Sequence, residues 1–117
     1  MKREYRLFLQ DIVGAIKSIQ DYVGRSSLDD IKKNRMAADA IVRNIEILGE
    51  AVVNIPEDIK KKYPEVPWIK IKNFRNVVIH QYWIVDYDIL WDIITTKLQV
   101  LKEQIKDILT QEKRSVP

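Results

Sequence analysis

Residues 5–23 read YRLFLQDIVGAIKSIQDYV and settle the fold class of the 117-residue chain. Apolar side chains recur along them at steps of three and four: Tyr5, Phe8, Leu9, Ile12, Ile16, Ile19 and Val23. This spacing places them on one face of an amphipathic helix. We predict a helix over about 3–23, ended by Gly24, because glycine tolerates the left-handed conformation common after a helix.

The same periodicity continues downstream and predicts three more long helices. They are expected over about Leu28–Asn54, Trp68–Gln81 and Asp86–Gln111. Ser26 or Ser27 is expected to cap the first of them and Asp86 to cap the last. No two-residue alternation competes with this pattern, so the fold class is all-α.

Two shorter segments complete the predicted architecture. Glu57–Lys62 is expected to form a short helix, which the prolines of 63–67 end. Residues 111–117 are expected to be a frayed tail. The whole chain, 1–117, is predicted to be one domain, an up-down bundle of four main helices with a short extra helix.

The amino-acid composition excludes several kinds of site and segment. The chain has no cysteine, which excludes disulfides and thiolate metal sites, and its single histidine disfavours zinc. No run approaches the roughly 18 apolar residues of a membrane span. We therefore expect a soluble, cytoplasmic protein. The formal charge of +3 favours polyanionic partners but does not by itself establish nucleic-acid binding.

The only histidine, His80, lies in FRNVVIHQY at 74–82, together with Arg75 and Tyr82. A lone histidine in an apolar segment is most often a packed side chain with a satisfied hydrogen bond. The combination is different, because leaving Arg75 or His80 buried and unpaired would cost several kcal/mol. A base that titrates near neutrality, a fixed cation and a phenol are the groups that phosphodiester chemistry uses.

On a regular helix Arg75 and His80 would lie roughly 140° apart, and Tyr82 about 10 Å beyond Arg75 on nearly the same line. The three side chains therefore do not converge on one helical face. Either the helix loosens near His80 or further groups come from elsewhere, and we favour a two-fold related copy of the chain.

Cleavage of RNA by its own 2′-hydroxyl requires a base for that hydroxyl and an acid for the leaving oxygen, each worth about 10²–10⁴-fold. One chain supplies one imidazole, whereas a symmetric dimer supplies two. Arg75 would hold the phosphate and stabilise the transition state. No metal or other cofactor is required.

Asp39, Arg43, Glu46 and Glu50 form a charged stripe on the second predicted helix. The stripe is either a solvated face of ion pairs or the border of the active cleft, with a carboxylate orienting Arg75. Similarly, the lysines around the irregular segment either face solvent or follow a phosphate backbone. They are Lys60, Lys61, Lys62, Lys70 and Lys72.

These residues together resemble a known family. The motif Arg75-x-x-x-x-His80-x-Tyr82 resembles that of HepT-type toxins, a branch of the HEPN superfamily of helical ribonucleases. The likeness covers about Asp39 to Ile94, and it includes IEILGEA at 45–51, Pro67-Trp68, Phe74-Arg75-Asn76 and Asp86-x-x-x-Leu90-Trp91.

The resemblance implies a metal-independent endoribonuclease, the toxin of a toxin–antitoxin pair, acting as a homodimer with its cleft at the interface. Arg75 and His80 correspond to the catalytic pair, with Asn76, Arg43, Glu46 and Glu50 as candidate supporting residues. The implied partner is a minimal nucleotidyltransferase antitoxin, which uses ATP to transfer AMP to Tyr82.

Two other functions remain open from the sequence. One is a non-catalytic helical module that binds a nucleotide or docks onto a nucleotidyltransferase. The other is a plain structural bundle in which the motif is a packed polar pair.

Overall fold

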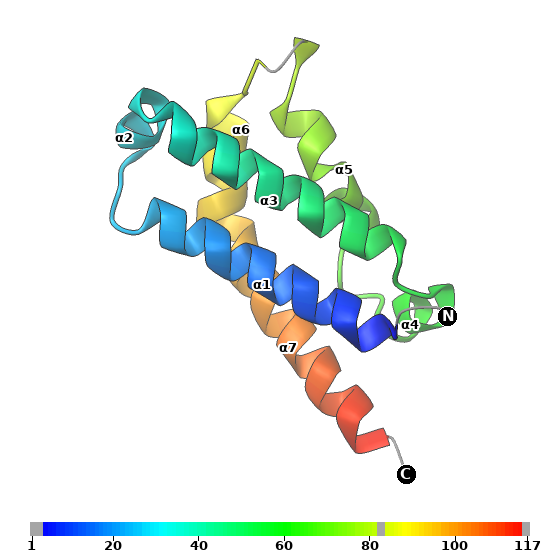
Figure 1. The fold of residues 1–117 in the computed structure, drawn as a ribbon. Coiled ribbons are helices and arrows are strands. Elements are labelled where there is room, and N and C mark those ends of the chain that lie inside the picture. The colour runs from blue at the N-terminus through cyan, green and yellow to red at the C-terminus, as the bar shows by residue number, and fades with distance from the viewer. Residues whose placement is uncertain (1–3, 82–83, 116–117) are drawn as a thin grey trace.

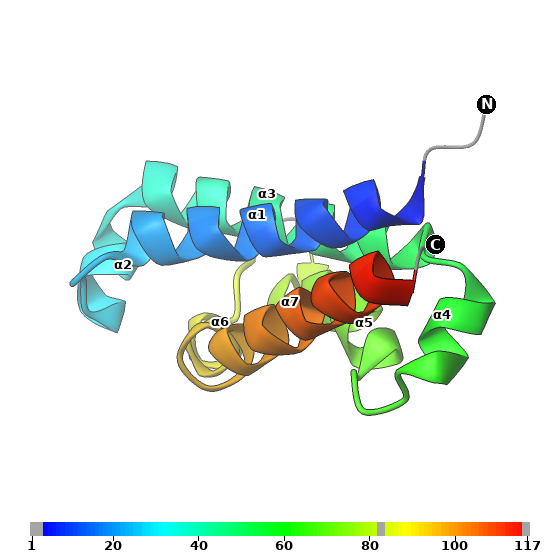
Figure 2. The same ribbon diagram turned by 90° about the horizontal axis from the view of Figure 1, so that it is seen from below.

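The amphipathic segments fold into helices packed in two layers, as a computed structural model shows (Figures 1 and 2). The structure describes residues 4–81 and 84–115. Its elements are α1 Tyr5–Val23, α2 Leu28–Lys33, α3 Arg35–Val53, α4 Glu57–Lys62, α5 Trp68–Val78, α6 Tyr87–Asp92, the π-helical η2 Ile93–Lys97 and α7 Leu98–Ser115. The described residues contain no strand, only one isolated bridge between Ile79 and Val85. The predicted all-α bundle of four main helices is confirmed, those helices being α1, α3, α5 and α7.

Helices α1 and α3 run side by side in opposite directions and form one layer, while α5, α6 and α7 lie across it in the other (Figures 1 and 2). Helix α2 lies at one end of the α1–α3 pair and α4 at the other. No helix of the described residues is long and apolar enough to cross a membrane.

The predicted apolar stripes form the core between these layers. Completely buried side chains come from every main helix, among them Ile12 and Ile16 of α1, Ile45 and Leu48 of α3, Ile71 of α5, and Leu98 and Ile105 of α7. Burial of each such aliphatic side chain contributes about 1.5–3 kcal/mol. The core thus fixes how the polar faces of α3 and α5 lie against each other.

The helix predicted over 28–54 is wrong as a single element, because Asn34 divides it. Its backbone leaves the helical region, and its side-chain oxygen accepts a hydrogen bond from the Ala37 N–H at 3.1 Å. Asn34 therefore caps α3 while the short α2 ends. The predicted cap by Ser27 is confirmed, in a reciprocal capping box with Asp30.

Three other predicted boundaries change. Helix α5 ends at Val78, three residues before the expected end, so His80 lies outside it. The helix predicted over 86–111 contains the π-helical turn η2, where the Thr95 and Thr96 hydroxyls donate to main-chain carbonyls one turn back. The frayed tail predicted for 111–117 is wrong up to Ser115, since α7 continues to that residue.

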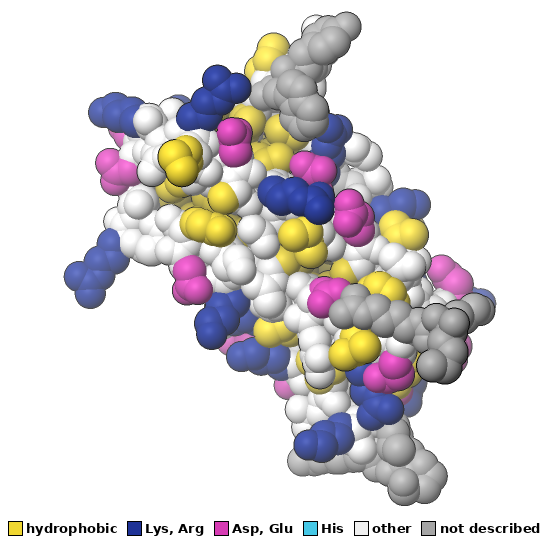
Figure 3. Space-filling model, in the orientation of Figure 1, with side chains coloured by type: hydrophobic (Ala, Val, Ile, Leu, Met, Phe, Trp, Pro, Cys, Tyr) yellow, Lys and Arg dark blue, Asp and Glu magenta, His cyan; other side chains and the backbone are white. Residues whose placement is uncertain are grey.

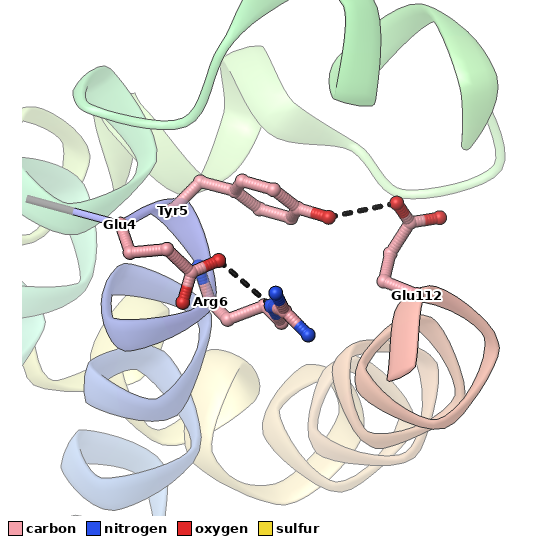
Figure 4. Close-up of polar contacts among 4 residues, drawn as sticks. All are labelled: Glu4, Tyr5, Arg6 and Glu112. Atoms are coloured by element: carbon pink, nitrogen blue, oxygen red, sulfur yellow. Dashed lines mark hydrogen bonds and ion pairs between the residues drawn. The ribbon is translucent and has the colours of Figure 1, made fainter. Parts of the chain in front are cut away.

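The end of α7 is ordered because Glu112 is buried in a polar cluster, of which Figure 4 shows the contact with Tyr5. Its carboxylate accepts hydrogen bonds from the Tyr5 O–H at 2.8 Å, from the Tyr63 O–H, and from the Lys62 ammonium at 2.8 Å. The bonds from Lys62 and Tyr63 hold the pKa of Glu112 down at about 2. This Glu112 cluster ties the ends of α1, α4 and α7 together.

Candidate active site

The segment after α5 closes into a small loop that carries His80. The Asp86 N–H donates to the Val78 carbonyl at 2.7 Å, and the His80 N–H donates to the Ile84 carbonyl at 2.8 Å. Ile79 and Val85 pair across the loop, and both of their apolar side chains contact the core. The loop is therefore anchored at its base, and it brings His80 close to the start of α6.

His80 faces Asp86, with 3.1 Å between the imidazole Nε2 and the carboxylate Oδ2. The other oxygen, Oδ1, accepts from the Ile89 N–H at 3.1 Å, so Asp86 also caps α6, as predicted. The bonds from the Ile89 N–H and from His80 hold the pKa of Asp86 below its usual range. The His80 side chain is 53% exposed, so the ring is held by one partner and remains accessible from solvent.

Asp86 is the site residue that sequence reasoning missed. The sequence predicts it as a helix cap, and nothing in the helical pattern places a residue six positions after His80 next to the imidazole. The signal is the cap itself. An aspartate that caps the helix after a short loop lies close to the side chains of that loop, which here include His80.

Arg75 lies in a different place, in a hollow of about 290 Å³ between α3 and α5. We call this the α3–α5 hollow, lined by Glu46, Glu50, Lys72, Arg75 and Asn76, with Gly49 and Val53. It brings the predicted Arg75, Asn76, Glu46 and Glu50 into one site. Three cationic or amide side chains thus face two carboxylates here.

Gly49 allows α3 and α5 to approach closely at this hollow. A Cβ atom at position 49 would lie 3.2 Å from the Lys72 carbonyl oxygen, tighter than ordinary van der Waals contact. The glycine therefore sets the separation of the two helices that carry Glu46, Glu50 and Arg75.

The charged stripe of α3 is both solvated and part of the hollow's rim. Arg43 is 60% exposed and lies 3.8 Å from a Glu46 oxygen and 3.7 Å from a Glu50 oxygen. Acidic and basic side chains accordingly lie next to each other over α3 in Figure 3. Such exposed pairs contribute at most about 1 kcal/mol each. The pairing of a stripe carboxylate with Arg75 stays a prediction.

The described part of the chain does not place His80 in the α3–α5 hollow. A neighbouring hollow of about 340 Å³ is lined by Glu46 together with Ile79 and Val85, the two residues that pair at the base of the histidine loop. Tyr82 lies outside the described residues. Within those residues no group of three or more His, Asp or Glu side chains is arranged to hold a metal ion.

The comparisons agree with the likeness seen in the motif. The family model Ribonuclease HepT-like matches residues 12–108. A relative named Putative RNase MJ0127, from Methanocaldococcus jannaschii, is 37% identical over 98% of each chain. Putative RNase TTE0752, from Caldanaerobacter subterraneus subsp. tengcongensis, is 36% identical over 92% of this chain and 96% of its own. Probable ribonuclease HepT, from Thermococcus cleftensis, is 33% identical over 92% of this chain and 98% of its own. No solved structure matches. The chain is thus a member of the HepT-like ribonuclease family.

Proposed function

We propose that this protein is a metal-independent endoribonuclease that cleaves RNA by attack of the 2′-hydroxyl on the adjacent phosphate. The observation that carries the proposal is the solvent-accessible His80 held by the Asp86 carboxylate. If Nε2–H donates to Asp86, the lone pair of the neutral imidazole is on Nδ1, the nitrogen available to the substrate. Nδ1 takes the 2′-hydroxyl proton, and Asp86 stabilises the imidazolium that forms.

Arg75 supplies the second role. A guanidinium binds a phosphate through two parallel N–H bonds and stabilises the charge that develops on its oxygens. Asn76 and Lys72 add donors in the same hollow. Arg75 therefore acts on the phosphate, while His80 moves protons.

We place the complete site in a homodimer. Of the two hollows described above, the α3–α5 hollow is lined by Arg75 and neither is lined by His80. A two-fold related copy would bring a second imidazole and a second guanidinium, and it would supply the acid that a single histidine cannot.

We further propose that the protein is the toxin of a toxin–antitoxin pair and that a nucleotidyltransferase antitoxin transfers AMP from ATP to Tyr82. Tyr82 follows His80 by two residues. An adenylyl group on a phenol only two residues along the chain from the proposed base would add bulk and negative charge, which disfavour the binding of an RNA phosphate. Intact mass after co-expression with the antitoxin tests this, because Tyr82→Phe should abolish the added AMP.

The nuclease is tested with RNA and EDTA, comparing the unmodified protein with His80→Ala and Arg75→Ala. Each substitution should lower the rate by about 10²–10⁴-fold. Gln81→Ala, an exposed neighbour, is the control that retains activity. Equal cleavage by all four proteins would reject the proposal. Binding of a nucleotide without any RNA cleavage would instead indicate the non-catalytic module.

Mixing the two inactive variants, with subunit exchange, tests the dimeric site. A mixed dimer keeps one intact Arg75 and one intact His80, on different protomers. If these two residues cooperate across the interface, activity should return to at most about a quarter of that of the unmodified protein, because half of the dimers are mixed and each regains one of two sites. A mixture that stays inactive shows that Arg75 of one protomer and His80 of the other do not suffice for cleavage, either because both residues of a site lie on one chain or because each site needs both imidazoles.

A further inference from the structure

A second hollow, larger than the one at Arg75, lies between α4 and the start of α5, at the end of the molecule away from α2 (Figure 1). Its volume is about 600 Å³. We call it the lysine groove. It is lined by Lys60, Lys61, Lys70 and Lys72, and by the apolar Val66, Pro67 and Ile69.

The groove carries a surplus of positive charge. Glu57 is the acidic residue of its lining, and it lies 3.6 Å from Lys60. Among the residues that the structure describes, Lys61, Lys70 and Lys72 have no carboxylate within ion-pair distance. Three cations on two adjoining helices are therefore available to an anionic ligand.

The lysine groove continues into the candidate active site. Lys72 lines both this groove and the α3–α5 hollow that holds Arg75. Glu46 in turn lines both the α3–α5 hollow and the hollow beside the histidine loop. The α3–α5 hollow thus shares a lining residue with each of the other two hollows.

The chemistry of the lining favours a flexible polyanion. Lysine ammonium groups are hydrated point charges on long stems, and they attract phosphates without reading a sequence. Ile69 is 75% exposed and presents apolar surface between the lysines. Unpaired bases can contact an apolar surface of this kind, whereas the bases of a duplex are stacked inside the duplex. Trp68 does not provide a stacking platform, since it is buried and donates its indole N–H to the Tyr63 carbonyl.

We propose that the lysine groove binds the single-stranded RNA that flanks the cleaved phosphodiester, a role that rests on the proposed ribonuclease function. Lys61, Lys70 and Lys72 hold successive phosphates of the strand. Lys72 passes the strand to Arg75, which binds the phosphate that is cleaved. The groove confers affinity for single strands and little sequence preference.

Binding of a fluorescent single-stranded RNA to the His80→Ala protein tests this without cleavage. The test variant adds Lys61→Gln, Lys70→Gln and Lys72→Gln. The matched control adds Lys17→Gln, Lys32→Gln and Lys106→Gln, three exposed lysines of α1, α2 and α7. Both triple variants change the net charge equally, so a difference between them reports position rather than total charge.

Loss of three phosphate contacts should lower the slope of log K against log salt by about 2 and weaken binding about 100-fold at 0.1 M salt. The control triple variant should retain most of both. Equal losses in the two triple variants would overturn the inference, and so would duplex RNA that binds as tightly as single strands. The wild-type chain with His80 intact reports on the nuclease separately. If it cleaves nothing while the lysine variant still loses RNA binding, the groove stands and the nuclease proposal fails.

Discussion

Asp86 is bound by two neighbours at once, the Ile89 N–H and the His80 imidazole. The first contact builds a helix and the second orients a proposed base. The two roles are separable by substitution, because asparagine is as good a helix cap as aspartate but carries no charge.

Asp86→Asn should therefore keep the fold and lower RNA cleavage by at least about tenfold, since the imidazole loses the carboxylate that orients it and stabilises its protonated form. Cleavage rates across pH 5–8 and a thermal unfolding curve measure the two effects. Asp86→Ala, which also loses the cap, should in addition unfold more easily by about 1 kcal/mol. If Asp86→Asn matches the unmodified protein at every pH, Asp86 has no positioning role.

At this scale the sequence predicted Arg75 and His80 as site candidates but not the contact between His80 and Asp86. The unusual pairing of polar residues within an apolar segment is visible in the sequence. The contact forms because the chain leaves the helix at Ile79. The apolar periodicity alone would have allowed the helix to continue past this residue. Only the main-chain bonds of the loop decide that Asp86 returns to the end of α5.

At the scale of the elements, the close approach of α3 and α5 leaves little room for a side chain at position 49. Gly49 lies inside α3, four residues before its end at Val53, and in a helix interior glycine is less favourable than alanine by about 0.8–1 kcal/mol. Its presence is explained by the Lys72 carbonyl oxygen 3.2 Å from the position of a Cβ. That oxygen belongs to the backbone of α5, so it yields only if the helix moves.

Gly49→Leu should destabilise the protein by about 1–3 kcal/mol, because the added side chain pushes the helices apart. Gly14 is the matched control, since it is also inside a long helix and has no atom within 4 Å of its Cβ position. Gly14→Leu should instead stabilise the protein by about 0.5–1 kcal/mol through helix propensity. Urea unfolding measures both changes. Equal tolerance of leucine at the two positions would show that the close approach does not constrain α3 and α5.

Helix identity could be predicted at this scale, whereas the break at Asn34 could not. The apolar stripes of α1, α3, α5 and α7 are long and regular, and burial follows them. Asn34 lies in a polar, exposed part of the sequence. One continuous helix and two helices separated at Asn34 would bury the same apolar residues, so the apolar pattern does not distinguish them. Its side-chain bond to the Ala37 N–H decides between them, and that bond depends on a local competition the periodicity does not record.

Over the whole molecule, the Glu112 cluster joins parts of the chain that are far apart in sequence, namely Tyr5, the Lys62–Tyr63 end of α4, and α7. The sequence predicts a tail in this region, because an isolated glutamate among charged residues carries no periodic signal. Its order comes from partners that only the tertiary fold supplies. The cluster therefore acts on global stability rather than on one helix.

The pKa values in the cluster give that stability a defined pH dependence. The pKa of Glu112 is lowered from 4.5 to about 2 in the folded protein, chiefly by the bonds from Lys62 and Tyr63. Its contribution is thus present above pH 4.5 and is lost as the pH falls towards 2. Burial and the hydrogen bonds to Glu112 raise the pKa of Tyr5 and of Tyr63 from 10 to about 12. Their contribution is present below pH 10 and is lost between pH 10 and 12.

Glu112→Gln should accordingly lower the free energy of unfolding by about 1–3 kcal/mol at pH 7, because the hydrogen bonds lose their charged acceptor. The difference from the unmodified protein should shrink as the pH falls from 4.5 to 2.5, since protonation removes the same charge from Glu112. Urea unfolding at pH 7, 4 and 2.5 measures this convergence. Asp107→Asn, on the exposed side of α7, removes one negative charge outside the cluster and should leave the stability difference small at all three pH values. Parallel curves for Glu112→Gln and the unmodified protein from pH 7 to 2.5 would mean that the ionised carboxylate does not hold the three helix ends together.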